Sequence, residues 1–154
     1  MKILVCVSVV PDTTTKITFT DGNTQFNKTG VQFIINPYDE LALTRALDIT
    51  EPIGGTVTVI TVGEADTEPV IRKALAMGAT DAIRVDANPS DGMYVAAQIA
   101  EQAKSGEYDM ILTGRESIDY NGGQVQGLIA EMLNWPLINV AMELDVTDKK
   151  VTAV

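Results

Sequence analysis

The chain has 154 residues, a length that fits one domain built around one hydrophobic core. Hydrophobic residues make up 45% and aromatic residues only 5%, which favours parallel strands under helices over an aromatic-rich sandwich. The formal net charge of −10 makes nucleic acid and an anionic membrane surface poor partners. The absence of His and the single Cys exclude a histidine proton relay and an internal disulfide.

The first predicted element is a buried strand. Residues Ile3 to Val9 are almost continuously apolar and β-branched, as in a central strand covered on both faces, and Pro11-Asp12 ends the run. Cys6 lies within it, where a buried structural thiol is expected. The run is too short to span a bilayer and no small-x-small cleavage pattern follows it. We therefore expect a cytoplasmic protein with no direct membrane insertion.

A peripheral excursion and a strong helix start come next. Lys16 to Thr20 and Val31 to Ile35 are two extended pieces around the turn at Asp21-Gly22-Asn23. Asn36 is a suitable cap, Pro37 suits the first helical position, and the acid at Asp39 favours the positive end of the helix dipole. As the simplest interpretation, Asp39 is only such a first-turn acid.

The rest of the chain alternates strands and helices. The predicted strands are Thr56–Val62, Ala82–Val85, Met110–Thr113 and a fifth at Ile138–Ala141, followed by a hairpin of Leu144–Val146 with Val151–Val154 around Asp148-Lys149-Lys150. The first helix between them runs from Thr67 to Gly78 with Val70, Ile71, Ala74 and Leu75 inward, and the second is capped by Ser90 with Ala96, Ile99, Ala100 and Ala103 inward. The third has Val125, Leu128, Ile129, Met132 and Leu133 inward, and Trp135-Pro136 stops it.

This alternation predicts an α/β fold with three layers and a doubly wound, mainly parallel sheet of five strands. We expect residues 1–154 to form a single nucleotide-binding domain. Because the sequence stops inside an apparent strand, we also expect it to be a fragment truncated at the C-terminus.

The most informative segment for chemistry is the loop from Gly114 to Val125. Gly114 ends a strand, and Gly122-Gly123 immediately precede a helix whose first N–H groups lack internal partners. Such a helix start can bind a phosphate, and Arg115 adds a cation. A tight turn explains the glycine pair equally well. The loop is neither a P-loop nor a GxGxxG fingerprint.

Catalytic side-chain chemistry is not expected. No pair of carboxylates has a spacing that suggests acid–base work, and no Ser lies in a G-x-S-x-G elbow. We expect no metal site, so a ligand-binding subunit fits better than a catalyst.

Four blocks of the sequence together resemble the electron transfer flavoprotein beta/FixA family. They are Val7-Ser8-Val9-Val10-Pro11-Asp12, Ile35-Asn36-Pro37-Tyr38-Asp39-Glu40, Ala74-Leu75-Ala76-Met77-Gly78-Ala79 and the loop from Gly114 to Val125, in the family's order and across essentially the whole chain. The resemblance implies a Rossmann-like domain of the adenine-nucleotide alpha hydrolase-like type. It also implies a heterodimer with an alpha subunit that passes electrons from dehydrogenases, and a beta subunit that holds AMP or a second FAD.

The resemblance also implies roles for individual residues. Cys6 would line the base pocket, Asn36, Pro37, Tyr38 and Asp39 would border the adenosine, Val62 would lie at the end of the second strand, and Gly114, Arg115, Asp119, Tyr120, Asn121, Gly122, Gly123, Gln124 and Val125 would wrap the phosphates.

The sequence departs from the family pattern at three places. Ser8 stands where the family usually has Lys, Glu116-Ser117 replaces Gln-Ala, and Gln126-Gly127 follows Val125 where a Gly normally comes first. Two alternatives stay open: a universal-stress-type ATP-binding module, whose glycine spacing fails at Ser117, and an interaction subunit with a degenerate nucleotide site, which Ser8 favours.

The end of the loop bears on which nucleotide binds. Gly123-Gln124-Val125 resembles the FAD-binding branch, because AMP-type members carry Asn-Gln-Thr there and Val125 has no hydroxyl to donate. Ser8 and the bulk of Tyr120 count against FAD. The pattern therefore favours FAD over AMP.

Overall fold

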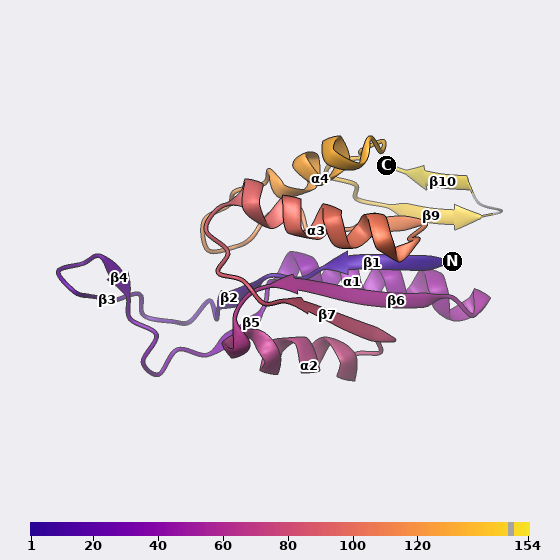
Figure 1. Ribbon diagram of the computed structural model, residues 1–154. Coiled ribbons are helices and arrows are strands. Elements are labelled where there is room, and N and C mark those ends of the chain that lie inside the picture. Colours follow the sequence, from indigo (N-terminus) through magenta and orange to yellow (C-terminus); the bar gives the residue numbers. More distant parts are fainter. Residues whose placement is uncertain (148–149) are drawn as a thin grey trace.

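The computed structural model describes residues 1–147 and 150–154. Its helices and strands alternate along the chain, as the sequence predicts (Figure 1). The elements are β1 (Lys2–Cys6), β2 (Val9–Pro11), β3 (Phe19–Thr20), β4 (Gln25–Phe26), β5 (Phe33–Ile35), α1 (Pro37–Thr50), η1 (Glu51–Ile53), β6 (Thr56–Val62), η2 (Ala65–Thr67), α2 (Glu68–Ala76), β7 (Asp81–Val85), α3 (Gly92–Gly106), β8 (Met110–Leu112), α4 (Val125–Leu133), β9 (Leu144–Thr147) and β10 (Lys150–Ala153).

The central sheet has four strands in the order β7-β6-β1-β8, and every neighbouring pair is parallel. The chain starts in β1, builds outward through β6 to β7, and then returns through α3 to β8 on the other side of β1. The direction of winding therefore reverses between β1 and β8, and ligands of open parallel sheets bind beyond the strand ends at such a point.

The prediction of a fifth strand at Ile138–Ala141 is wrong. This segment is irregular and exposed, with Ile138 59% and Val140 57% accessible to solvent. Val140 has a φ of 56°, a left-handed conformation that β-branched residues rarely adopt and that no regular strand contains. Strand propensity is realised only where a partner strand and a packing surface are present, and within the described residues β8 pairs with β1 alone.

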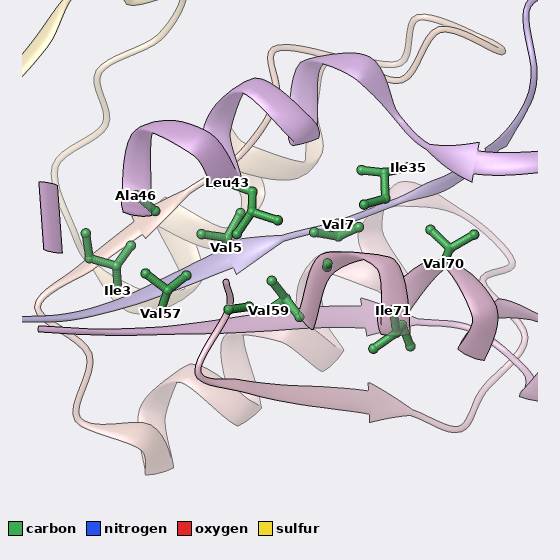
Figure 2. Close-up of a cluster of buried hydrophobic side chains, with 12 residues drawn as sticks. Ile3, Val5, Val7, Ile35, Leu43, Ala46, Val57, Val59, Val70 and Ile71 are labelled. Carbon is green, nitrogen blue, oxygen red and sulfur yellow. The ribbon is translucent and has the colours of Figure 1, made fainter. Parts of the chain in front are cut away.

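Helices cover both faces of the sheet, as predicted (Figure 1). Alternation along β1 sends Ile3 and Val5 to one face, where α1 and α2 pack, and Leu4 and Cys6 to the other, where α3 and α4 pack. Figure 2 shows the first cluster, in which Leu43 of α1 lies over β1. Because both faces are covered, β1 is apolar from Ile3 to Cys6. In β6 the residues from Val57 to Thr61 are all buried, and every one of them is β-branched.

The helices confirm most of the predicted inward faces, but one inward residue and one helix cap are corrected. The predicted α3 residues Ala96, Ile99, Ala100 and Ala103 are all buried. In α2, however, Leu75 is 39% exposed, because it lies at the margin of a helix face centred on Val70, Ile71 and Ala74. The cap of α3 is Asp91, whose Oδ1 accepts from the backbone N–H of Tyr94 at 2.8 Å, so the assignment of the cap to Ser90 is wrong.

The N-terminal excursion is organised differently from the prediction. The first strand ends at Cys6, and the chain then bends so that β2 pairs antiparallel with β5 in a separate small sheet. Lys16–Thr20 contributes only β3, which pairs with β4, while the Val31–Ile35 piece contributes β5. The β3–β4 hairpin projects away from the sheet (Figure 1).

The predicted C-terminal hairpin is confirmed as antiparallel β9 and β10, although Asp148 and Lys149 of its turn lie outside the described residues. Arg45 of α1 anchors it by donating to the Leu144 carbonyl and pairing with Asp145 at 2.7 Å. Across the described part of the chain, every helix is too short or too polar to cross a membrane.

Candidate functional site

The candidate site lies where the winding of the sheet reverses. The chain leaves β1 towards Ser8 and leaves β8 towards Gly114, and α1 begins beside both of these strand ends. The polar side chains of the first turn of α1 thus meet both loops at the carboxyl edge of the sheet.

Asp39 connects the two loops to α1. Its Oδ2 accepts from the backbone N–H of Ser8 at 2.8 Å and from the Ser8 hydroxyl at 2.6 Å, and its Oδ1 accepts from the backbone N–H of Gly114 at 2.9 Å. The residue is only 6% exposed. Asp39 is therefore more than the first-turn helix acid of the simplest interpretation.

Burial raises the pKa of Asp39 above its ordinary value, and the hydrogen bonds from Ser8 and Gly114, together with the nearby Asn36 side chain, oppose that rise in part. Burial also raises the pKa of the Cys6 thiol, and the Asp39 carboxylate adds to that rise. Cys6 is thus held as an unreactive thiol at the end of β1.

Asn36 occupies the cap position of α1 but its side chain does not cap the helix. Instead its Nδ2 donates to the Glu116 carbonyl at 2.8 Å, and its Oδ1 accepts from the Ile118 backbone N–H at 3.2 Å. Together with Asp39 it thereby holds three alternate loop residues, Gly114, Glu116 and Ile118. The predicted capping bond is wrong because a buried amide, 1% exposed, finds its partners in the loop that covers it.

Several backbone N–H groups of the loop are unused as donors. Within the described part of the chain, the backbone N–H groups of Arg115, Ser117 and Asp119 donate to no protein acceptor, and the same is true of those of Gly123, Gln124 and Val125. The Ser117 Oγ is buried and also has no partner among the described residues. Such a set of free donors suits an anionic or acceptor-rich ligand.

Two charged side chains of the loop, Arg115 and Glu116, pair with each other. Arg115 Nη2 lies 2.7 Å from Glu116 Oε1, which also accepts from Asn121 Nδ2 at 3.0 Å, and these contacts lower the pKa of Glu116. The Arg115 guanidinium lies 5.7 Å from the centre of the Tyr38 ring. Arg115 is half-exposed and has further donors, so the pairing with Glu116 leaves it able to contact a ligand.

Glycine is required at two loop positions for different reasons. A Cβ at Gly114 would overlap the Asp39 carboxylate and the backbone of α1, so the strand end can approach the helix only without a side chain. Gly123 has a φ of 58°, which favours glycine, and leads directly into the first turn of α4. These positions put the backbone of the loop close to any group bound there.

A second helix start meets the loop. The Gln124 side chain packs against Gly92, the first residue of α3, so closely that a Cβ at Gly92 would lie 2.9 Å from Gln124 Nε2. The N-termini of α3 and α4 therefore lie close together beside the loop. Both helix dipoles favour negative charge at this place.

A hollow of about 580 Å³ adjoins the loop. Ile118 and Asp119 form one wall, while Asp12, Ile17 and Phe26 of the N-terminal excursion lie across from them. Because its exposed surface is mostly apolar, the hollow suits a flat ring better than a second phosphate.

The structure joins most of the predicted site residues. Hydrogen bonds or packing link Asn36, Tyr38, Asp39, Gly114 and Arg115 directly, and Pro37 lies in the same helical turn. The remaining loop residues, Asp119, Asn121, Gly122, Gly123, Gln124 and Val125, follow in one continuous segment. Cys6 and Val62 end the adjacent strands β1 and β6 and belong to the cluster on the α3–α4 face of the sheet.

Three contributors were missed from the sequence as site residues. Ser8 bonds Asp39, Ser117 offers a free hydroxyl, and Gln126 clamps the carbonyls of Arg115 and Gly123 at 2.9 Å each. The signal for all three was a departure from the family pattern, since Ser8 replaces Lys, Ser117 replaces Ala and Gln126 stands where a Gly normally comes.

Comparison with known proteins supports the family resemblance that the sequence motifs indicate. The sequence model of the family described as electron transfer flavoprotein domain matches residues 23–154. The chain is 35% identical over 150 residues to the electron transfer flavoprotein subunit beta of Bacillus subtilis, covering 95% of this chain and 58% of that protein. It is 35% identical over 158 residues to protein FixA of Azotobacter vinelandii, covering 97% of this chain and 56% of that protein.

A further relative is the acryloyl-CoA reductase electron transfer subunit gamma of Anaerotignum propionicum, 36% identical over 145 residues, with 90% of this chain and 54% of that protein covered. The chain spans rather more than half the length of these curated relatives. The matched domain covers residues 23–154, and the chain belongs to the electron transfer flavoprotein family.

Proposed function

We propose that this chain is the nucleotide-holding part of an electron transfer flavoprotein beta subunit and that it binds FAD or AMP. The observation that supports this most directly is the loop that is tied to α1 by three of its residues while six of its backbone N–H groups have no acceptor among the described residues. Phosphate oxygens would accept from Gly123, Gln124 and Val125, each bond to a charged group contributing about 1.5–3 kcal/mol. The adenosine would lie between the ends of β1 and β6 and the first turn of α1.

The structure fits such a ligand at three points. Gly123 leaves room for a phosphate, since the nearest non-neighbouring atom to a Cβ built there is the Arg115 carbonyl oxygen at 3.9 Å. The orphaned Ser117 hydroxyl would gain the partner that a buried polar atom requires. Arg115 supplies a positive charge in a chain whose net charge is −10.

FAD is the preferred ligand over AMP. Val125 offers no hydroxyl to a terminal phosphate, and the hollow beside Ile118 and Asp119 has room for a group that extends beyond the phosphates. The apolar side chains of Ile17 and Phe26 in its wall suit an aromatic ring.

In the intact protein we propose a heterodimer with an alpha subunit that accepts electrons from dehydrogenases in the cytoplasm. The names of the relatives, a beta subunit and an electron transfer subunit among them, support this role. A bound flavin would supply the redox chemistry, and the residues described here would bind and orient it. The sheet order and the site at its carboxyl edge support the adenine-nucleotide alpha hydrolase-like class.

The test is to purify the intact beta subunit with its alpha subunit and count the cofactors per heterodimer by absorption and mass spectrometry. Two FAD molecules per heterodimer support FAD as the ligand of the beta subunit, whereas one FAD and one AMP show that this ligand is AMP. A complex in which the beta subunit holds no nucleotide would instead establish an interaction subunit with a degenerate site.

A further inference from the structure

We infer that Ser8 and Asp39 form a latch: their hydrogen bonds fix Gly114, the first residue of the Gly114–Val125 loop, and thereby set the affinity of that loop for the nucleotide. The inference rests on the proposed function, and it makes both residues positioning residues rather than ligand contacts. The latch consists of Ser8 and Asp39, and Gly114 is the residue that it holds.

The geometry of Asp39 separates it from the ligand. Its two oxygens accept from three donors, all within 2.9 Å, which belong to the ends of β1 and β8. The carboxylate is buried behind the loop, and the absent side chain of Gly114 is what allows it to sit there. Asp39 therefore acts on a ligand only through the loop that it holds.

The Ser8 hydroxyl has a specific part in the latch. Among the described residues no Lys or Arg pairs with Asp39, so its buried charge is stabilised by hydrogen bonds alone. The bond from the Ser8 Oγ, at 2.6 Å, is the shortest of the three. Without it, Oδ2 would keep one donor, and the carboxylate would hold the Ser8 and Gly114 backbones less firmly.

Alternation along the loop extends the effect of the latch. Asp39 fixes Gly114, and Asn36 fixes Glu116 and Ile118, while the intervening N–H groups of Arg115 and Ser117 donate to no acceptor among the described residues. If Gly114 is released, the first of these three anchors is lost. The backbone N–H donors of the loop then adopt many orientations, and the loss of this conformational entropy on binding lowers the affinity for the ligand.

The experiment compares the wild-type chain with Ser8→Ala, Asp39→Asn and the hydroxyl-preserving Ser8→Thr. Ser105→Ala is the matched control, because it removes a serine hydroxyl that donates to the Gln102 carbonyl near the end of α3. Hydrogen exchange of the Gly114 amide, followed by NMR in the ligand-free chain, reports the latch directly. Calorimetric titration with AMP and with FAD reports the affinity.

We expect Ser8→Ala and Asp39→Asn to speed exchange at Gly114 about tenfold or more while core amides of β1 and β6 keep their protection. Affinity for the bound nucleotide falls by about tenfold, and Ser8→Thr restores both properties. Ser105→Ala behaves as wild type. Should Asp39→Asn not fold, as judged by circular dichroism, the comparison of Ser8→Ala with Ser8→Thr decides.

Unchanged exchange at Gly114 in Ser8→Ala overturns the latch, and so does faster exchange without loss of affinity. Failure of the proposed function looks different, because the wild-type chain would then bind neither AMP nor FAD. That result removes the link to affinity, while exchange at Gly114 still decides whether the latch exists.

Discussion

At the scale of single residues, the environment of Asp39 leads us to expect a stability that depends on pH. Burial, the largest influence, raises its pKa above the ordinary value of 3.8. A carboxyl whose pKa is higher in the folded state binds its proton more tightly there. Its contribution to stability is fully present below the ordinary pKa and is lost as the pH rises through the folded pKa.

Asp39→Asn tests this sign. The free energy of unfolding of wild type minus that of the variant is expected to be largest below about pH 3.8 and to fall as the pH rises through the titration of Asp39. Urea denaturation at a series of pH values measures the difference. A difference that stays constant or grows with pH contradicts the raised pKa.

Ser117 provides a second residue-scale prediction. Because its buried hydroxyl has no protein partner within the described residues, Ser117→Ala is expected to leave the thermal midpoint of the ligand-free chain unchanged or to raise it. The same change weakens nucleotide binding by roughly three- to tenfold, the loss of one neutral hydrogen bond.

Differential scanning fluorimetry without ligand and calorimetry with AMP and FAD provide the two readouts. A thermal midpoint that is unchanged or higher, together with a lower affinity, identifies a hydroxyl that bonds the ligand and not the protein. A fall in the ligand-free midpoint, or an unchanged affinity, would show that Ser117 is bonded within the protein instead.

At the scale of elements, the segment from Gly123 into α4 combines a left-handed residue with a helix N-terminus. A β-branched side chain at Gly123 strains the turn and blocks the approach of the backbone to a phosphate. We expect Gly123→Val to weaken nucleotide binding more than tenfold, a cost above about 1.4 kcal/mol.

The matched control is Gly127→Ala, within the helix and with open space around its Cβ. It is expected to stabilise the chain by about 0.5–1 kcal/mol without loss of affinity. Calorimetry and denaturation distinguish the two glycines. Equal affinities of Gly123→Val and wild type would remove the loop from the phosphate site.

At the scale of the whole molecule, the composition bears on whether the chain can turn over a redox substrate by itself. It has no histidine, its single thiol is buried, and its net charge of −10 leaves Arg115 as a local cation beside the candidate site. We expect the purified chain, without added flavin or partner, to show no dehydrogenase or oxidase turnover. Dye-reduction assays with and without FAD and the alpha subunit check this, and turnover by the chain alone refutes it.

The sequence by itself determined the layered α/β architecture and the place of the loop. The local patterns that burial on a sheet requires are the continuous apolar run in β1, the β-branched run in β6, and apolar residues spaced three and four apart in α2, α3 and α4. The Gly114–Val125 segment was likewise recognisable, because glycines at a strand end and before a helix are local signals.

Only the tertiary structure decided how the polar residues of the site are used. Asn36 looked like a cap and Asp39 like a helix acid, yet both bond residues about 75 to 82 positions away in the sequence. Ile138–Ala141 has strand composition but adopts no strand, because pairing depends on a neighbouring edge. Hydrogen-bond partners and strand neighbours are properties of chain crossings in space, and local propensity contains no information about which segments will meet.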